Sequence, residues 1–531
     1  MKKRIISIML AALMIIMSMT GCSDGSNSTN SNSQENNSEN NASSNNPADR
    51  TLKLRLTSSL TSLDWEQTTN IRDMKVWHQM YEGLYGMDEA NNGYYKELAK
   101  DVQLSEDQKV YTITLQDGVK FQNGDDLKAS DVVFSYNRAI KNPRFNYVTF
   151  MISDVEAVDD QTVKITLDQA YAPIDHTFFS IKIMSEREVT EQGDKFGTIP
   201  NKAGTGPYYP VDYNIATGVK LKAFEDYWRG APDIKDVEYV VISDDAAAVI
   251  AFENHELDYF EEAPLSDWES LIKASGQNNV MVKGNNIMFM AINYLSSDVL
   301  ANEKVREAMF YAVNKKDINS AASNGYGTEA TQYMPSDYVA TSPIDGFKTY
   351  DYDPEKAKAL LAEAGYPDGV DIGTISAYGT SSSENAKMAQ VIQANLSQVG
   401  IKAGVEVMEY STLSPRLYAQ DYDVCIFYDS SNYDFNNIRQ QVHSESEGMY
   451  VVKYKDGPFN WQRMEELVDL GASTADVNER LNYYTELWSM VMDTATILPC
   501  LHRPVPTVWA ENLNIGTPVP TYYKIRTFSW K

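Results

Sequence analysis

The chain has 531 residues, 43% of them hydrophobic, and a net charge of −28 at pH 7. This length and apolar content support a core large enough for two or three domains. The excess of acidic residues argues against nucleic acid as a partner, because binding of phosphate requires a basic patch.

The first 21 residues are predicted to be a lipoprotein signal peptide. A cationic start, Lys2-Lys3-Arg4, precedes an apolar run from residue 5 to residue 19. The run is shorter than the roughly 20 apolar residues of a membrane-spanning helix and fits the core of a signal peptide. It ends at Met19-Thr20-Gly21-Cys22, which resembles the lipobox of bacterial lipoproteins, with Met19 where leucine is usual. The resemblance implies lipid attachment at Cys22; a conventional secretory signal beside a bystander cysteine is the alternative.

Residues 22–50 are predicted to form a disordered tether behind this anchor. Of the 27 residues from Ser23 to Asp49, 17 are Asn or Ser. Such a segment has too little apolar area to offset its chain entropy. We therefore expect a domain held outside the cell membrane, on a Gram-positive surface or in a Gram-negative periplasm, although an ordinary disordered tail is the alternative.

Strand and helix patterns follow each other along the rest of the chain. Residues 110–116 alternate apolar and polar side chains as in a strand, and Ser130 is predicted to cap the next helix. Asp353-Pro354 is a typical helix start, with aspartate as cap and proline at the first position. A further helix and two strands are predicted at residues 389–399, 401–407 and 423–428. The pattern indicates an α/β protein with a mixed sheet.

Five sequence blocks in a fixed order carry a family resemblance. They are Tyr81-Glu82-Gly83-Leu84 with its continuation Tyr111–Arg138, then Gly204-Thr205-Gly206-Pro207-Tyr208, Tyr227-Trp228, Glu303–Val313 and Tyr352–Tyr366. Together they resemble the peptide and nickel family (family 5) of ABC-importer extracellular solute-binding proteins, which includes oligopeptide- and dipeptide-binding lipoproteins. Most of these blocks are interpreted as scaffold. Gly204 and Gly206 are predicted to give a tight turn its backbone freedom.

The resemblance implies an α/β fold of the two-lobed, type II periplasmic-binding-protein kind. This fold is a clamshell with an additional α/β domain and a two-strand hinge. Lobe I would comprise residues 51–86, 200–290 and 508–531, the additional domain residues 87–199, and lobe II residues 291–507. The two crossings that form the hinge would lie near Met290 and Thr507.

The implied function is that of a monomeric lipoprotein that captures a short peptide between its lobes and delivers it to an ABC-transporter permease. An oligosaccharide or other small solute, a metal chelate, or a sensor role without transport are the alternatives. No cofactor is expected, and no direct metal site, because the five histidines show no ligand spacing. No enzyme is expected either, because G-x-S-x-G and H-E-x-x-H are missing and Ser270–Lys273 fits S-x-x-K without its companion motifs.

Candidate ligand-binding residues come from the same resemblance. Peptide-binding members place an aspartate after a strand of the second lobe, where it pairs with the peptide's α-amino group; Asp429 takes that position here. Asp429 could instead cap a turn, and Ser430-Ser431-Asn432 follows where peptide binders carry a proline. The weaker candidates are Tyr410, Tyr428, Tyr433, Leu60 in the segment LTSLD, and Arg416 as the nearest cation for a carboxylate. Whether Cys425 and Cys500 form a disulfide is left open.

Overall fold

The structure is a computed structural model that describes residues 50–68, 70–88, 93–335, 339–380, 383–430, 434–444, 452–519 and 523–531. These residues belong to one compact unit, Asn45–Lys531. The signal peptide, Cys22, nearly all of the tether and Tyr433 lie outside the described residues. Within those ranges, no helix combines the length and the apolar character that crossing a membrane requires.

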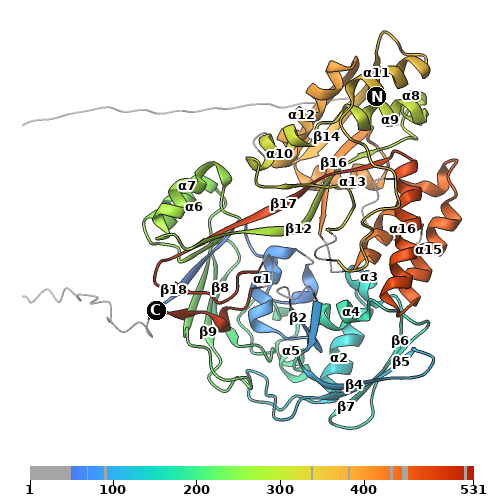
Figure 1. The fold of residues 1–531 in the computed structure, drawn as a ribbon. Helices are drawn as coiled ribbons and strands as arrows, with labels where there is room; N and C mark the ends of the chain where they lie inside the picture. The colour runs from blue at the N-terminus through green and yellow to red at the C-terminus, as the bar shows by residue number, and fades with distance from the viewer. Residues whose placement is uncertain are drawn as a thin grey trace, which may run out of the picture. The chain divides into compact units, whose positions relative to one another are not determined.

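A long mixed sheet organises the described part of the chain (Figure 1). Its order is β15-β14-β16-β12-β17-β11-β1-β10-β9-β8, and β13 pairs with β17 off this path. The strands are β15 (Ile401–Met408), β14 (Val370–Tyr378), β16 (Val424–Ser430), β12 (Asn279–Ile292), β17 (Ile497–Trp509), β11 (Tyr259–Glu261), β1 (Leu52–Leu56), β10 (Asp236–Val241), β9 (Gly218–Ala223), β8 (Tyr208–Asn214) and β13 (Thr328–Glu329). The two longest strands, β12 and β17, lie in the middle and are antiparallel partners.

A separate four-stranded sheet has the order β4-β5-β7-β6. Its strands are β4 (Ala99–Leu104), β5 (Val110–Leu115), β7 (Thr162–Leu167) and β6 (Ile152–Ala157), and α2 (Ala129–Ile140) packs on β6 and β7. Two short pairs, β2 (Tyr85–Asp88) with β3 (Gly93–Lys96) and β18 (Leu513–Asn514) with β19 (Ser529–Trp530), complete the described strands.

Helices cover the sheets because each has one apolar face to bury. The helices of the chain before residue 275, besides α2, are α1 (Ile71–Met80), α3 (Asn146–Thr149), α4 (Ile174–Ser180), α5 (Glu186–Gln192), α6 (Asp245–Glu253) and α7 (Trp268–Ala274). Those of the later part of the chain are α8 (Asp298–Ala301), α9 (Glu303–Ala312), α10 (Lys315–Ser323), α11 (Pro354–Glu363), α12 (Glu384–Gln398), α13 (Tyr410–Tyr418), α14 (Arg439–Val442), α15 (Trp461–Ser473) and α16 (Val477–Asp493).

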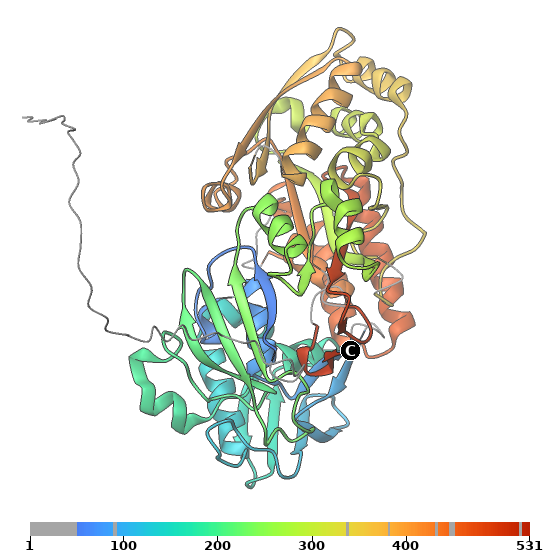
Figure 2. The same cartoon turned by 90° about the vertical axis from the view of Figure 1, so that its left-hand side faces the viewer.

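Two large hydrophobic cores lie on either side of the central strands. One core is built from residues between Ile287 and Leu501, with Phe289 and Trp488 fully buried. The other draws mainly on residues before Tyr259 and after Ala510, with Trp65 and Tyr136 fully buried. Among the described strands, β12 and β17 connect the part of the sheet coloured yellow and orange to the part coloured blue and green (Figures 1 and 2). The exact domain boundaries given above stay predictions.

Most of the predicted elements are confirmed, with two local corrections. The predicted strand at residues 110–116 is β5, and Asp353 caps α11 by accepting a hydrogen bond from the Lys356 N–H at 2.9 Å. Ser130 does not cap α2: the helix starts at Ala129, and the Asp131 carboxylate accepts from the Lys128 N–H at 3.0 Å. The predicted strand at 423–428 extends to Ser430, because its last residues continue to pair with β12.

Three of the recognised motifs meet at one buried carboxylate, that of Glu82, which is 3% exposed. Glu82 accepts hydrogen bonds from the Tyr227 hydroxyl at 2.6 Å, the Trp228 indole N–H at 2.9 Å and the Thr205 hydroxyl at 2.9 Å. Burial, with the neighbouring Glu97 charge, raises the pKa of Glu82. These motifs therefore hold the scaffold together, which agrees with their interpretation from the sequence.

The glycines of the Gly204-to-Tyr208 motif are required for space. Neither Gly204 nor Gly206 has a positive φ, so the predicted need for backbone freedom is wrong. A Cβ on Gly204 would lie 1.9 Å from the Met80 carbonyl oxygen, and one on Gly206 would lie 2.6 Å from the same atom. The motif thus lets its backbone pass directly against the end of α1.

The two cysteines of the described residues, Cys425 and Cys500, are free, buried thiols. Cys425 lies on β16 and Cys500 on β17, and β12 runs between these strands. The disulfide that the sequence left open is therefore not formed in this structure.

Candidate functional site

The pairing of β12 with β17 is irregular at two places, and the second shift lies between Met288 and Phe289. The register shifts between Lys283 and Ile287, so residues 284–286 lie opposite Arg503. A Cβ on Gly284 would lie 2.0 Å from the Arg503 carbonyl oxygen, so only glycine fits there. On β17, Pro499, Pro504 and Pro506 lack the N–H that a strand normally donates. The crossing is therefore held by fewer ladder bonds than a regular strand pair.

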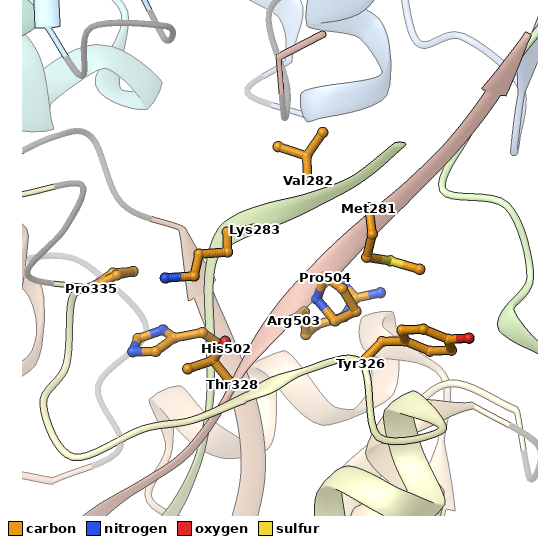
Figure 3. A pocket seen from close by; sticks show the side chains of 10 residues that line it. Met281, Val282, Lys283, Tyr326, Thr328, Pro335, His502, Arg503 and Pro504 are labelled. Carbon is orange, nitrogen blue, oxygen red and sulfur yellow. The ribbon is translucent and has the colours of Figure 1, made fainter. Parts of the chain in front are cut away.

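A pocket opens at this irregular crossing (Figure 3). It measures about 370 Å³ including the space at its mouth, and it is lined by Met281, Val282, Lys283, Gly284, Tyr326, Thr328, Pro335, His502, Arg503 and Pro504. Figure 3 shows Lys283 of β12 and His502 of β17 on one side of the pocket and Tyr326 on the other. We call this space the crossing pocket. Two of its lining side chains, Lys283 and Arg503, carry positive charge.

Asp429 lies close to this pocket, inside β16. It pairs with Ile287 of β12, and Ile287 in turn pairs with His502 of β17. Since neighbouring strands are about 4.8 Å apart, Asp429 and His502 are separated by about 10 Å across the sheet. The Asp429 carboxylate accepts hydrogen bonds from the Tyr333 hydroxyl at 2.6 Å and from the Asn437 amide at 3.4 Å. The expectation that Asp429 follows its strand is corrected, because Asp429 lies within β16.

An aromatic cluster joins two of the predicted tyrosines. The Tyr378 ring centroid lies 5.4 Å from that of Tyr410 and 5.6 Å from that of Tyr428. Tyr410 begins α13 and remains 43% exposed. The Arg503 guanidinium lies 5.7 Å from the centre of the Tyr428 ring and pairs with the carboxylate of Glu384. The cluster therefore adjoins the crossing pocket through Arg503.

Two of the remaining candidates lie elsewhere. The Leu60 side chain is buried in a hydrophobic core, so a ligand would meet only its backbone. Arg416 pairs with Glu406 at 2.8 Å and Asp421 at 3.2 Å, and it does not line the crossing pocket. The predicted ligand roles of these residues, and that of Tyr433, stay predictions.

Sequence reasoning missed Lys283, His502 and Arg503. They meet only because β12 and β17 are separated by about two hundred residues in the chain and pair in space. The run Ile497–Trp509, with three prolines in one strand, was the signal that could have directed attention to this place. Among the described residues, no group of three His, Cys, Asp or Glu side chains is arranged to hold a metal ion.

The sheet, its two cores and the crossing strands together define a two-lobed α/β binding protein. Residues 93–443 match the model of bacterial extracellular solute-binding proteins, family 5. The glutathione-binding protein GsiB of Salmonella typhi is 31% identical over 372 residues, which cover 68% of this chain and 70% of that protein.

Solved structures agree on the fold. HbpA2 from Haemophilus parasuis has a TM-score of 0.75 and 26% identity, covering 91% of this chain and 100% of that one. NikA from Brucella suis, in complex with Fe(III)-EDTA, has a TM-score of 0.81 and 20% identity over the same shares.

The chain belongs to family 5 of the bacterial extracellular solute-binding proteins. The predicted two-lobed fold class and family are thereby confirmed. Since the relatives are solute-binding proteins of ABC transporters, the chain is a binding protein and not an enzyme.

Proposed function

We propose that this protein is a lipid-anchored, monomeric binding protein that captures a short peptide between its lobes and delivers it to an ABC-transporter permease. The named ligand of its relative GsiB, glutathione, is itself a tripeptide. We propose that the lobes have the boundaries predicted from the sequence, and that the cleft includes the crossing pocket.

The observation that carries the proposal is the charge distribution around the crossing strands. A free peptide has an ammonium group at one end and a carboxylate at the other. Asp429 supplies an anion on β16, Lys283 supplies a cation on β12, and Arg503, which pairs with Glu384, lies on β17. A buried ammonium requires a counter-charge, because its desolvation would otherwise prevent binding. A site that places negative and positive side chains within reach of one small ligand suits a zwitterion better than a neutral solute.

The aromatic cluster favours one second candidate, a neutral solute such as an oligosaccharide. Tyr378, Tyr410 and Tyr428 offer broad ring surfaces with polar tips, and Tyr410 is accessible. In a peptide carrier the same rings would contact the ligand's side chains. Identification of the bound solute separates these candidates.

The experiment is a mass spectrum of the small molecules released when the purified, undialysed protein is denatured. Peptides of two to a few residues, absent from a parallel preparation of the denatured and washed protein, support peptide capture. Release of sugars without peptides would make the oligosaccharide carrier the correct assignment.

The anchor gives a separate prediction. Substitution Cys22→Ala removes the only proposed site of lipid attachment, so the protein should move from the membrane fraction to the medium or periplasm. Cell fractionation and immunoblotting measure this, with Cys425→Ala as the matched control, because that buried thiol should leave the protein in the membrane fraction. A processed Cys22→Ala protein that stays with the membrane would contradict lipid anchoring.

A further inference from the structure

A second pocket lies beside β11 and β1. In the sheet, β11 pairs with β17 on the edge opposite to β12. The pocket is lined by Arg55, Leu56, Thr57, Arg72, Lys75, Tyr259, Glu261, Glu262 and Tyr523. Its walls come from the end of β1, from α1 and from β11. We call it the lobe I pocket. Nothing in the sequence patterns directed attention to it.

Two guanidinium groups line this pocket with N–H groups that have no hydrogen-bond partner. The Arg55 side chain is only 2% exposed; its Nε donates to the Ile242 carbonyl at 2.8 Å and one Nη donates to Asp245 at 2.7 Å. Its other Nη is buried and has no partner among the described residues. The Nε of Arg72 is likewise buried and without a partner in the described part of the chain. Buried donors of this kind are rare, because an unmade hydrogen bond to a charged group is costly.

The carboxylates of the pocket are already engaged by its third cation. Lys75 lies 2.5 Å from Glu261 and 3.0 Å from Glu262. Lys75 also holds the pKa of Glu262 down to about 2, so this carboxylate stays ionised. The lining holds three cations and two carboxylates, and a third carboxylate, that of Asp245, pairs with Arg55 from outside the lining. Among the described residues, Arg72 is the cation of this lining for which no ion pair within 4 Å is found.

The two pockets are neighbours along β17. Glu261, in the lobe I pocket, pairs with Thr507, whereas Pro504, three residues earlier on the same strand, lines the crossing pocket. Three residues of a strand span about 10 Å. Arg503 of the crossing pocket also contributes to the lowered pKa of Glu262, which shows that the pockets share one electrostatic environment.

We propose that the lobe I pocket binds a carboxylate of the captured solute through the unused N–H groups of Arg55 and Arg72. Guanidinium groups are suited to this task, since their planar donors match the two oxygens of a carboxylate. One carboxylate would satisfy the buried N–H groups of Arg55 and Arg72 together. This subsite rests on the proposed function, and it assigns to Arg55 and Arg72 the carboxylate contact that the sequence assigned to Arg416.

The test is competitive capture from two tripeptide libraries of equal composition, one with free C-terminal carboxylates and one with C-terminal amides. Retained peptides are quantified by mass spectrometry. We expect the wild-type protein to enrich the free acids at least tenfold over the amides, and Arg72→Gln to reduce that preference to less than threefold. Arg144→Gln, which removes an exposed arginine of the small-sheet region, is the matched control and should keep the wild-type preference.

Arg55 is buried, so its variant is conservative. Arg55→Lys keeps the charge but removes the unused N–H, and it should lower the preference for free acids while the protein retains its thermal unfolding transition. The carboxylate subsite would be refuted if the wild type captured free acids and amides equally, or if Arg72→Gln kept the preference for free acids. The proposal of peptide capture would be unaffected by either result. Capture of no tripeptide from either library would overturn both proposals.

Discussion

Asp429→Asn should weaken the binding of a peptide with a free N-terminus by about 30- to 5,000-fold. The substitution keeps the shape of the side chain and removes the counter-charge, and loss of one member of a buried charge pair costs about 2–5 kcal/mol. Calorimetric titration of the peptide identified by mass spectrometry measures the effect. The acetylated peptide should bind poorly to the wild type, and acetylation should matter much less in Asp429→Asn, because the interaction it disrupts is already gone.

Tyr333→Phe is the matched control, because Tyr333 donates the 2.6 Å hydrogen bond to Asp429. If Asp429 recognises the amine, Tyr333→Phe keeps the counter-charge and should cost about tenfold at most. It should also retain the preference for the free amine. Equal weakening of free and acetylated peptides in Asp429→Asn, matched by Tyr333→Phe, would instead assign Asp429 a purely structural role.

Glu82→Ala should lower the free energy of unfolding by about 3–5 kcal/mol, because removal of one partner from a buried charged network leaves the others uncompensated. The donors of Thr205, Tyr227 and Trp228 would lose their acceptor at once. Urea unfolding followed by tryptophan fluorescence measures the change, and Trp228 reports directly on the site.

Glu225→Ala is the control for this effect. The Glu225 side chain is 66% exposed and pairs with Lys235 at 3.1 Å, so its loss should change the free energy of unfolding by about 0.5 kcal/mol or less. Similar losses in Glu82→Ala and Glu225→Ala would show that the three motifs do not depend on Glu82.

Local sequence patterns predicted the elements of this fold well because they reflect local physics. The alternation at residues 110–116 and the cap at Asp353 depend on neighbouring residues only, and both are confirmed. The reason for Gly204 was misjudged because the clash that excludes a side chain comes from Met80, more than a hundred residues away. Periodicity carries no information about such contacts.

The candidate site was predicted only in part for the same reason. The family resemblance indicated Asp429, Tyr410 and Tyr428 from their positions relative to a predicted strand of the second lobe, but it did not indicate Tyr378, which joins the two tyrosines. The recognised sequence blocks do not contain Arg55, Arg72 or Arg503. These residues became candidates only when the structure placed them in the linings of the two pockets. Arg416, the candidate from the sequence for a carboxylate contact, is paired with Glu406 and Asp421, and its ligand role stays a prediction.

The most direct test of solute capture between the lobes is small-angle X-ray scattering of the ligand-free protein and of the protein saturated with its peptide. Ligand that contacts both lobes stabilises only the closed state, and we expect the lobes to pivot at the crossing of β12 and β17. We expect the radius of gyration to fall on saturation, and the same peptide with an acetylated N-terminus to produce no change at equal concentration. An identical scattering profile with and without peptide, at saturation demonstrated by calorimetry, would contradict capture by closure.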